Sequence, residues 1–327
     1  MSILQQLENH EILIVGDVMI DRYLTGSVNR ISPEAPVPVV LQQGMHDRLG
    51  GAANVALNIR ALGSIPVLCS VIGMDDAGKQ LKNNILAENN IDSDGMVFSQ
   101  TRRTTVKTRI LGNNQQMLRI DSEDTDDLNA EEQASLLDRI RQLIAERPIR
   151  AIVLQDYNKG VLTAEVIEKV VEEAKKAGIL TTVDPKHANF FAYRGVDLFK
   201  PNLKEIRDSL PFTVQATVES LTEASAFLRE RLENRLTMIT LSEKGLFLDD
   251  SKESRLFPTI PRNIADVSGA GDTVISIATL GLVAGLPIQT IAQLSNLAGG
   301  QVCEFPGVVP VNRDILETEW KQWEHQS

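Results

Sequence analysis

Short apolar runs alternate with amphipathic segments along most of the chain. Residues 11–16, Glu-Ile-Leu-Ile-Val-Gly, form one such run, which is typical of a strand buried on both faces of a parallel sheet. Similar runs occur at residues 66–72, 151–154, 180–183, 196–199 and 236–241. Segments with helical spacing lie between them, at residues 53–62, 80–89, 131–145, 164–177 and 218–232. This alternation predicts an α/β fold with a doubly wound, mostly parallel sheet, in which ligands bind at the carboxyl ends of the strands.

Two segments lack this alternation. Residues 23–43 contain three prolines among valines, and residues 104–121 are rich in Thr, Val and Ile around a turn at Gly112–Asn114, which is typical of a hairpin. We therefore expect a single domain over residues 1–327, with an inserted β-sheet lid formed by about 22–44 and 103–121. An isolated small sheet exposes an apolar face, which favours pairing with a second lid. The acidic stretch Asp121–Glu132 is expected to be a solvated linker that leads into a helix.

The composition is that of an ordinary soluble globular protein. The 327 residues are 43% hydrophobic, and the net charge of −11 argues against binding to nucleic acid, which requires a basic surface. The polar, acidic N-terminus lacks the features of a signal peptide, and no apolar run is long enough to span a bilayer. Cys69 and Cys303 lie in apolar surroundings without metal-ligand spacing, as core cysteines of a reducing compartment do. We therefore expect a cytoplasmic protein that contacts neither nucleic acid nor membrane.

The stretch Asp-Val-Ser-Gly-Ala-Gly-Asp-Thr at residues 266–273 opens an apolar helix. Backbone N–H groups at a helix start lie at the positive end of the dipole, and the small Gly269, Ala270 and Gly271 let an anion approach them. A phosphate there would repel Asp272 unless that carboxylate accepts the proton of an attacking hydroxyl. The motif therefore indicates an anion hole with Asp272 as the general base. Taken alone, the same residues also describe an ordinary glycine-rich helix start with an acid favoured by the dipole.

Two further groups of residues are candidates for binding a polyhydroxylated substrate. Asp17 and Asp21 follow the first strand, and carboxylates accept hydrogen bonds from vicinal hydroxyls. Gly50 and Gly51 permit a close approach, and the amide of Asn54 both donates and accepts. The alternatives are solvated loop acids for the aspartates and a tight turn with a helix cap for the second group.

These motifs resemble the signatures of the ribokinase-like (PfkB) family of sugar kinases. The turn at residues 266–273 has the form of the second signature, residues 50–58 (GGAANVALN) resemble the first, and residues 200–205 (KPNLKE) resemble an N-x-x-E element. The resemblance extends from Ile12 to about Pro310. It implies that ATP is the phosphoryl donor and that the lid forms contacts in a homodimer.

The resemblance also assigns residues to ATP and Mg²⁺. Asn202 and Glu205 would organise Mg²⁺-bound water around the phosphates, with no direct protein ligand to the metal. The same two residues have the spacing of a helix capping box, and both interpretations can hold together. The remaining candidates for the nucleotide site are Thr240, Ser242, Gly245 and Asn296, with Gly299 as a weaker one.

Residues 29–39 (NRISPEAPVPV) closely resemble the kinases among the bacterial enzymes that make ADP-activated heptose. Further matches to this subgroup lie at residues 49–56, 114–116, 184–186, 241–243 and 271–274. The resemblance implies phosphorylation of the anomeric C1 hydroxyl of D-glycero-D-manno-heptose 7-phosphate to the 1,7-bisphosphate, for ADP-heptose and lipopolysaccharide core synthesis. Two alternatives stay open: a kinase for another acceptor (ribose, a fructose phosphate or a nucleoside) and a non-catalytic sugar sensor.

A sugar that already carries a phosphate requires cationic partners in this acidic protein. The sequence offers candidates in lid and loop segments without ranking them: Arg30, Lys107, Arg109, Arg119 and Lys186. Bifunctional members of the subgroup carry a nucleotidyltransferase element that does not follow here. We therefore expect a separate nucleotidyltransferase to carry out the adenylylation step.

Other patterns do not support a competing chemistry. Residues 73–79 (GMDDAGK) approach a P-loop, but Gln80 stands where a P-loop has Ser or Thr, and two acids would face the phosphates. The stretch instead resembles the G-x-D-x-x-G turn of PfkB kinases. The four histidines, at positions 10, 46, 187 and 325, have no metal-ligand spacing.

Overall fold

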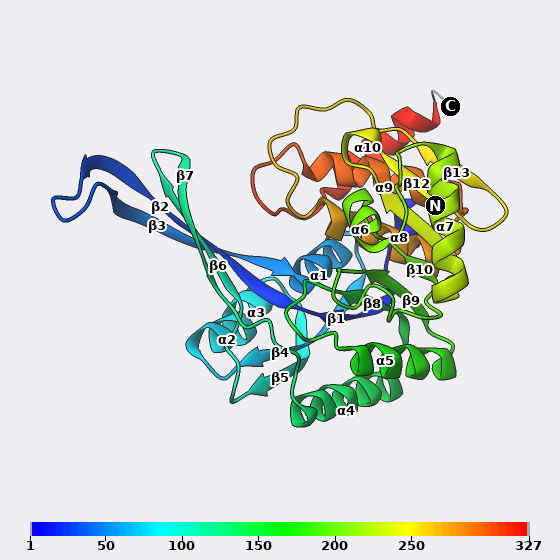
Figure 1. Ribbon diagram of the computed structural model, residues 1–327, viewed down its shortest axis with the longest axis horizontal. Coiled ribbons are helices and arrows are strands. Elements are labelled where there is room, and N and C mark those ends of the chain that lie inside the picture. The colour runs from blue at the N-terminus through cyan, green and yellow to red at the C-terminus, as the bar shows by residue number, and fades with distance from the viewer. Residues whose placement is uncertain (1, 326–327) are drawn as a thin grey trace.

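The computed structural model describes residues 2–325, and the main body of the protein is built on one nine-stranded sheet (Figure 1). The parallel part has the order β5 (Asp92–Ser99), β4 (Ile65–Gly73), β1 (Glu11–Gly16), β8 (Ile149–Gln155), β9 (Leu180–Asp184), β10 (Leu198–Phe199) and β11 (Leu236–Thr240). An antiparallel hairpin, β12 (Leu246–Asp249) and β13 (Ser254–Phe257), completes the sheet beyond β11. The predicted doubly wound α/β fold is confirmed. The sequence pattern did not predict β5, β12 and β13: the edge strands β5 and β13 mix polar and apolar residues, and β12 is only four residues long.

Alternate side chains of β1 enter two separate apolar cores. Ile12 and Ile14 pack with α1 (Ala52–Ala61), α8 (Ala270–Val283), α9 (Ile288–Val302) and α10 (Arg313–Glu324). Leu13 and Val15 pack with α4 (Ala130–Glu146), α5 (Ala164–Ala177), α6 (Leu203–Ser209) and α7 (Val218–Leu232). Helices therefore cover both faces of the sheet, which is why its central strands are apolar throughout. No helix within residues 2–325 combines the length and the apolar character that crossing a membrane requires.

The stretch that approaches a P-loop is a capped turn. Asp75 accepts a hydrogen bond from Gly78 N at 2.8 Å and so begins α2 (Asp76–Gln80). Its carboxylate also accepts from Thr104 N at 2.8 Å and from Thr104 Oγ1 at 2.7 Å, just before the lid strand β6. The helix predicted over residues 80–89 continues as a π-helical turn (Leu81–Ile85) and α3 (Leu86–Glu88). The turn therefore ties the main body to the lid.

A separate four-stranded sheet forms the lid, which projects from the main body (Figure 1). Its order is β3 (Pro38–Gly51), β2 (Val18–Ile31), β6 (Val106–Gly112) and β7 (Gln115–Ser122). The two predicted lid segments pair with each other, because β2 and β6 run in parallel from Ile20↔Val106 to Gly26↔Gly112. The strands reach further than the expected segment 22–44, since β2 begins at Val18 directly after β1, and β3 ends at Gly51 directly before α1.

The register gives the two faces of the lid opposite characters. Asp21 pairs with Arg48 and Lys107, and Tyr23 pairs with Arg109, so these five side chains share one face, here called the inner face. Arg48 contacts the loop after α9, so the inner face is directed toward the main body. The outer face carries apolar side chains at the alternate positions, and Met45, Leu118 and Ile120 are 50%, 54% and 51% exposed there.

Candidate active site at the start of helix α8

Asp272 is buried in the first turn of α8, beside the end of β8, with only 3% of its surface exposed. Three donors hold its carboxylate. Asn54 Nδ2 donates to Oδ2 at 2.7 Å, while Tyr157 Oη and Gln155 Nε2 donate to Oδ1 at 2.8 and 3.1 Å. Because these donors belong to α1, to β8 and to the loop after β8, three separate parts of the main body fix this one side chain.

The surroundings of Asp272 make it a stronger base than an ordinary aspartate. Burial raises its pKa from 3.8 to about 6. The hydrogen bond from Asn54 lowers the pKa, the charge of Asp184 raises it, and the hydroxyl of Tyr157 lowers it. A carboxylate with this pKa is mostly ionised at neutral pH and is still basic enough to share a proton in a transition state.

A buried ion pair lies directly behind the anion hole. Lys200 Nζ is 3.0 Å from Asp184 Oδ2, and the two side chains are 2% and 7% exposed. Burial raises the pKa of Asp184, but the charges of Lys200 and Lys186 hold it below its ordinary value. A methyl group on Gly271 would lie 3.4 Å from Asp184 Oδ2 and 3.7 Å from Lys200 Nζ. The pair therefore supplies a fixed cation next to the predicted phosphate site without leaving Asp184 unpaired.

The predicted anion-hole residues come together at this helix start. Gly269 precedes the helix with a left-handed backbone (φ 83°), which favours glycine. The N–H of Ala270 donates to the carbonyl of Val267 at 3.4 Å, so this group is partly engaged. Gly271 and Asp272 occupy first-turn positions, whose N–H groups have no acceptor within an α-helix. The opening of the helix at Gly271 is therefore the best placed to receive an anion.

Asp17 has a different position from the one predicted. Its carboxylate is 1% exposed and accepts backbone hydrogen bonds from Tyr157 at 2.8 Å, Lys159 at 3.1 Å and Val161 at 3.1 Å. Burial raises its pKa to about 6, and the charge of Asp156 adds to the effect. This geometry gives Asp17 the role of anchoring the loop that carries Tyr157. Contact between Asp17 and a sugar stays a prediction.

Asp21, Gly50, Gly51 and Asn54 lie together where the lid joins the main body. A methyl group on Gly50 would lie 2.3 Å from Asp21 Oδ2, and one on Gly51 would lie 2.3 Å from the carbonyl oxygen of Asp17. Gly51 also has a left-handed backbone (φ 60°) at the start of α1. The glycines therefore bring the lid carboxylate of Asp21 and the α1 amide of Asn54 to the same end of the sheet.

Asn202 and Glu205 form the capping box of α6. Glu205 N donates to Asn202 Oδ1 at 2.9 Å, and Asn202 N donates to Glu205 Oε2 at 2.8 Å. Lys186 forms an ion pair with Glu205 and lies 5.6 Å from the centre of the Tyr157 ring. Burial lowers the pKa of Lys186, but the charges of Asp184 and Glu205 raise it above its ordinary value. Lys186 therefore lies beside the transfer site, and not in the lid.

A cavity of about 740 Å³ lies next to the start of α8. Its walls include most of the residues predicted to bind the nucleotide: Thr240, Ser242, Gly245, Ala270, Gly271 and Asn296. The weaker candidate Gly299 also lines it. Asn296 Nδ2 donates to the carbonyl of Pro258 at 2.7 Å, so this amide holds the loop that forms one wall. The cavity opens at Gly271, beside Asp272.

The remaining predicted cations are scattered over the lid. Arg30 is exposed at the far end of β2, and Arg119 is 51% exposed on β7, where it pairs with Asp121 at 2.9 Å. Lys107 lies 3.4 Å from both Asp121 and Glu123. Arg109 is 18% exposed, and its guanidinium donates to Asp21 at 2.5 Å. Of these four, Arg109 is the one in contact with a predicted sugar-binding residue.

Sequence reasoning missed Gln155, Tyr157, Lys200 and Arg48. Gln155 and Tyr157 follow the apolar run 151–154, at the same edge of the sheet that singled out Asp17. The rule that polar residues after parallel strands face the ligand site would have found them. Lys200 lies inside the KPNLKE element, but nothing in the sequence indicates that its partner is Asp184.

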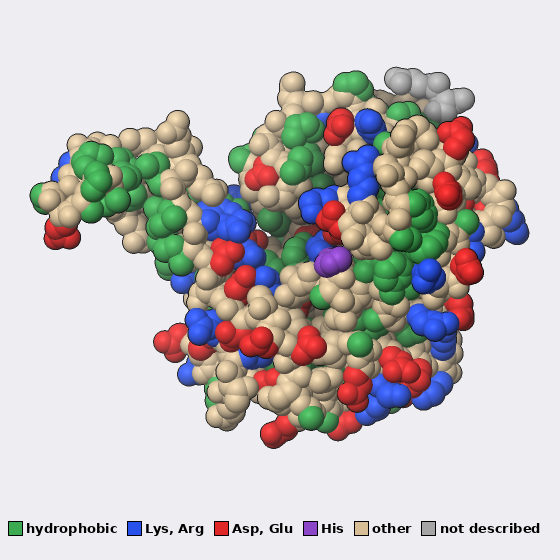
Figure 2. Space-filling view, in the orientation of Figure 1, with side chains coloured by type: hydrophobic (Ala, Val, Ile, Leu, Met, Phe, Trp, Pro, Cys, Tyr) green, Lys and Arg blue, Asp and Glu red, His purple; other side chains and the backbone are tan. Residues whose placement is uncertain are grey.

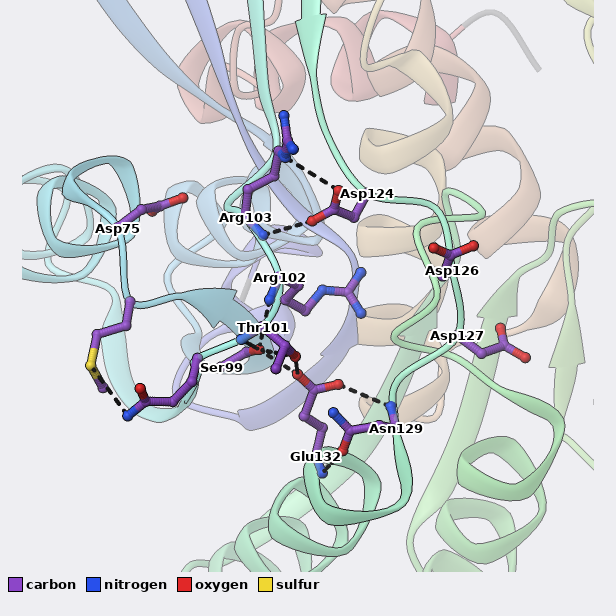
Figure 3. A pocket seen from close by; sticks show the side chains of 12 residues that line it. Asp75, Ser99, Thr101, Arg102, Arg103, Asp124, Asp126, Asp127, Asn129 and Glu132 are labelled. Carbon is purple, nitrogen blue, oxygen red and sulfur yellow. Dashed lines mark hydrogen bonds and ion pairs between the residues drawn. The ribbon is translucent and has the colours of Figure 1, made fainter.

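A second cavity, of about 670 Å³, lies where the linker after β7 meets the ends of β4 and β5 (Figure 3). Five of its twelve lining residues are acids and two are arginines, and several of its polar groups bind one another. Arg103 N donates to Asp124 at 2.7 Å, and Thr101 Oγ1 donates to Glu132 at 3.0 Å. Asn129 and Glu132 form the capping box of α4. Its two arginines are already engaged, Arg102 with the carbonyl of Lys159 and Arg103 with Asp124, so we interpret this cavity as a junction between lid and main body.

The doubly wound α/β body with its separate β-sheet lid is the architecture of the ribokinase-like fold. A model of the pfkB family of carbohydrate kinases matches residues 9–314. The chain therefore belongs to the pfkB family of carbohydrate kinases.

Curated relatives share about two fifths of their residues with this chain. The bifunctional protein HldE of Methylobacillus flagellatus is 41% identical over 308 residues, which cover 94% of this chain and 62% of that protein. HldE of Syntrophotalea carbinolica is 38% identical over 317 residues, covering 96% of this chain and 64% of that protein. The chain thus spans somewhat less than two thirds of the length of these relatives.

Solved structures support the same fold. Phosphofructokinase-2 from Escherichia coli, in complex with substrates and products, has a TM-score of 0.80 at 18% identity, covering 96% of this chain and 99% of that one. Ribokinase from Arabidopsis thaliana, complexed with ribose and ATP, has a TM-score of 0.72 at 17% identity, covering 95% of this chain and 98% of that one.

Proposed function

We propose that the protein transfers the γ-phosphate of ATP to the anomeric C1 hydroxyl of D-glycero-D-manno-heptose 7-phosphate. The product, the 1,7-bisphosphate, would serve ADP-heptose and lipopolysaccharide core synthesis in the cytoplasm. The observation that carries the proposal is the buried Asp272 beside an open helix start, in a chain 41% identical to a bifunctional HldE protein. A pfkB kinase for another acceptor, such as ribose or fructose 6-phosphate, is the alternative.

The hydrogen bonds of Asp272 favour one of its two oxygens as the proton acceptor. A carboxylate oxygen offers about two lone pairs. Tyr157 and Gln155 occupy both on Oδ1, whereas Oδ2 accepts from Asn54 alone. Oδ2 therefore keeps one lone pair for the C1 hydroxyl. As that hydroxyl attacks the γ-phosphorus in line with the departing ADP oxygen, its proton passes to Oδ2.

Charge on the transferring phosphoryl group is stabilised by parts of the chain that are already in position. The N–H of Gly271 and the dipole of α8 face the phosphate, and Lys200 and Lys186 place two cations beside it. Positioning and fixed charge of this kind are the main contributions to phosphoryl transfer.

The residues around Glu205 fit a metal that is held mostly through water and phosphate. Within residues 2–325, no group of three or more His, Cys, Asp or Glu side chains is arranged to hold a metal ion. Glu205 and Asp184 are instead paired with lysines, which suits a Mg²⁺ that retains its waters. When bound with ATP, Mg²⁺ neutralises β- and γ-phosphate oxygens. Asn202 and Glu205 would orient its water shell.

The acceptor would lie between the lid and the start of α1, with Asp21, Gly50, Gly51 and Asn54 against its hydroxyls. We also propose that the exposed apolar outer face of the lid pairs with the lid of a second copy. Met45, Leu118 and Ile120 would be buried in that homodimer.

The test is ATP consumption with the heptose 7-phosphate, beside ribose and fructose 6-phosphate, with the product identified by phosphorus NMR. We expect a new anomeric phosphate with the heptose alone. Turnover of ribose or fructose 6-phosphate in its place would retain the role of Asp272 and reject the proposed acceptor.

A further inference from the structure

Two arginines and one tyrosine form a compact group on the inner face of the lid. The guanidinium carbon of Arg48 lies 5.1 Å from the centre of the Tyr23 ring, and that of Arg109 lies 5.3 Å from the same centre. The strand register explains this arrangement, because Tyr23 pairs directly with Arg109 while Arg48 pairs with Asp21, two positions along β2. An aromatic ring in contact with two guanidinium groups holds the N–H groups of both in fixed directions.

The two arginines differ in their partners. Arg109 donates to Asp21, which fixes its orientation. Arg48 donates to the carbonyl oxygens of Pro306 at 3.1 Å and Val308 at 3.2 Å. Among the ion pairs within residues 2–325, none gives Arg48 a carboxylate partner. The group therefore contains a partly buried positive charge that is not neutralised by an ion pair, in a protein whose net charge is −11.

Direct contacts connect this group to the base. A methyl group on Gly307 would lie 2.5 Å from Arg48 Nη1 and 3.0 Å from Tyr23 Oη. A methyl group on Gly269 would meet both Asn54 Nδ2, at 2.9 Å, and Val308 Cγ1, at 3.3 Å. Asn54 in turn donates to Asp272. Arg48 is thus linked to Asp272 through Val308 and Asn54, and a sugar whose reacting hydroxyl meets Asp272 would extend toward this arginine pair.

From this arrangement we infer that Arg48 and Arg109, held on Tyr23, bind the phosphate that the acceptor sugar already carries. Planar guanidinium forks match the oxygens of a phosphate, and the hydrogen bonds they make to it are charge-assisted. The inference rests on the proposed function, because it requires a phosphorylated acceptor. It also explains how an acidic protein selects a dianionic sugar. Figure 2 shows basic side chains on the wall of the hollow between the lid and the main body.

Steady-state kinetics with a phosphorylated and an unphosphorylated acceptor test the inference. For Arg48→Gln and Arg109→Gln, we expect kcat/KM for the heptose 7-phosphate to fall about 10- to 100-fold, since each lost charged hydrogen bond has an effect of that size. The value for the unphosphorylated heptose should fall by clearly less than the value for the heptose 7-phosphate, so the preference for the phosphate collapses. Arg194→Gln, which removes an exposed arginine that pairs with Glu233 outside the lid, is the control and should leave both values unchanged.

The outcomes separate the binding site from the acceptor. If another phosphorylated sugar is turned over and shows the same dependence on Arg48 and Arg109, the heptose assignment fails and the phosphate site stands. Equal losses for both members of a sugar pair, or no loss, would overturn the phosphate site. If no sugar is turned over, calorimetry with inorganic phosphate decides, with the nucleotide site filled by a non-hydrolysable ATP analogue. Binding that is weakened in both variants and not in Arg194→Gln supports the site, and unchanged binding rejects it.

Discussion

The start of α8 and the lid differ in how tightly they hold their functional side chains. Asp272, Asn54 and Gln155 are 3%, 0% and 0% exposed, and all three are joined by hydrogen bonds. On the lid, Arg109 is 18% exposed and Arg30 lies in solvent. The chemistry that all acceptors share is therefore built into a rigid body before substrates bind. Under the proposed function, recognition of a particular acceptor depends on the lid. Substitutions in this single sheet disturb fewer neighbouring residues than substitutions in the main body.

The layers around each region account for this difference. The helix start is supported by two apolar cores, one on each face of the main sheet. The lid is a single four-stranded sheet whose outer face meets α2 at its base, where Gln80 bonds Arg22 and Asp47, while Leu118 and Ile120 further along stay exposed. Such a sheet is marginally stable by itself and gains from a partner. Substitutions at α8 should therefore change catalysis, whereas substitutions on the lid should change selection or assembly.

The largest effect is expected for Asp272→Asn. Turnover should fall by about 10³-fold or more, because the general base is lost while the surrounding donors remain. ATP binding measured by calorimetry should stay within about threefold of the wild type. Asp126→Asn, which neutralises an exposed linker acid, is the control and should retain full activity. Near-normal turnover by Asp272→Asn would remove Asp272 from the mechanism.

Gly50→Ala should disturb the contact between the lid and the main body. The new methyl group would lie 2.3 Å from Asp21 Oδ2 and 2.8 Å from Met19 Cγ, so the lid strand must shift. We expect kcat/KM for the acceptor to fall about 10- to 100-fold while the KM for ATP is unchanged. Gly178→Ala, at a left-handed position with nothing within 4 Å of the added carbon, controls for backbone strain. An equal rise in both KM values would show that the junction does not separate the two functions.

Tyr157→Phe sharpens the role of the hydrogen bonds at Asp272. Removing this donor should raise the pKa of Asp272 above its value of about 6, because the bond favours the ionised carboxylate. The rate requires the ionised form, so the acidic limb of kcat/KM should move to higher pH, with about a tenfold loss below pH 6 and a smaller loss above pH 8. Tyr193→Phe is the matched control, since that hydroxyl binds Asp156 at 2.7 Å. An unshifted limb would show that Tyr157 has no influence on the base.

The smallest effect on turnover is expected for the pair Leu118→Lys and Ile120→Lys. Both positions are on the outer face of the lid, away from the arginines. Charges there should convert the proposed homodimer into monomers, measured by light scattering after gel filtration, with turnover changed less than about threefold. Gln115→Lys, at an exposed position near the β7 turn, is the control. A dimer that persists in the double variant would assign assembly to another surface.

Much of the architecture was predictable because apolar runs of strand length have few alternative placements. The runs beginning near Glu11, Pro66 and Ala151 all became parallel strands. The turn at Gly269 was also predictable, because its glycine-rich motif is contiguous, and the residues predicted for the nucleotide at positions 240–245 and 296 line one cavity. The predictable features are therefore those that depend on one short, contiguous segment of the sequence.

The unpredicted features depend on contacts between distant segments. Asp17 was expected to face a sugar, but its carboxylate is used by backbone N–H groups about 140 positions later. Lys186 was one of five unranked candidates for the sugar phosphate, and its pairing with Glu205 and its position near Asp184 could not be read from the sequence. No sequence motif singled out Arg48, because its position depends on strand pairing with Asp21 and on a hydrogen bond to the carbonyl of Pro306. Sequence periodicity contains no information about such pairings.

The bond between Asn54 and Asp272 joins residues 218 positions apart, and Thr273 Oγ1 donates to Asn58 over a similar separation. Helix α1 is therefore packed against α8, which the ribosome supplies much later. A nascent chain can form β1, β4 and the lid long before it has a base or an anion hole. Contacts of such long range also slow folding. Until α8 has been synthesised, the surface of α1 that α8 later covers stays exposed to other chains. The order of synthesis thus delays any enzymatic activity until most of the chain has emerged.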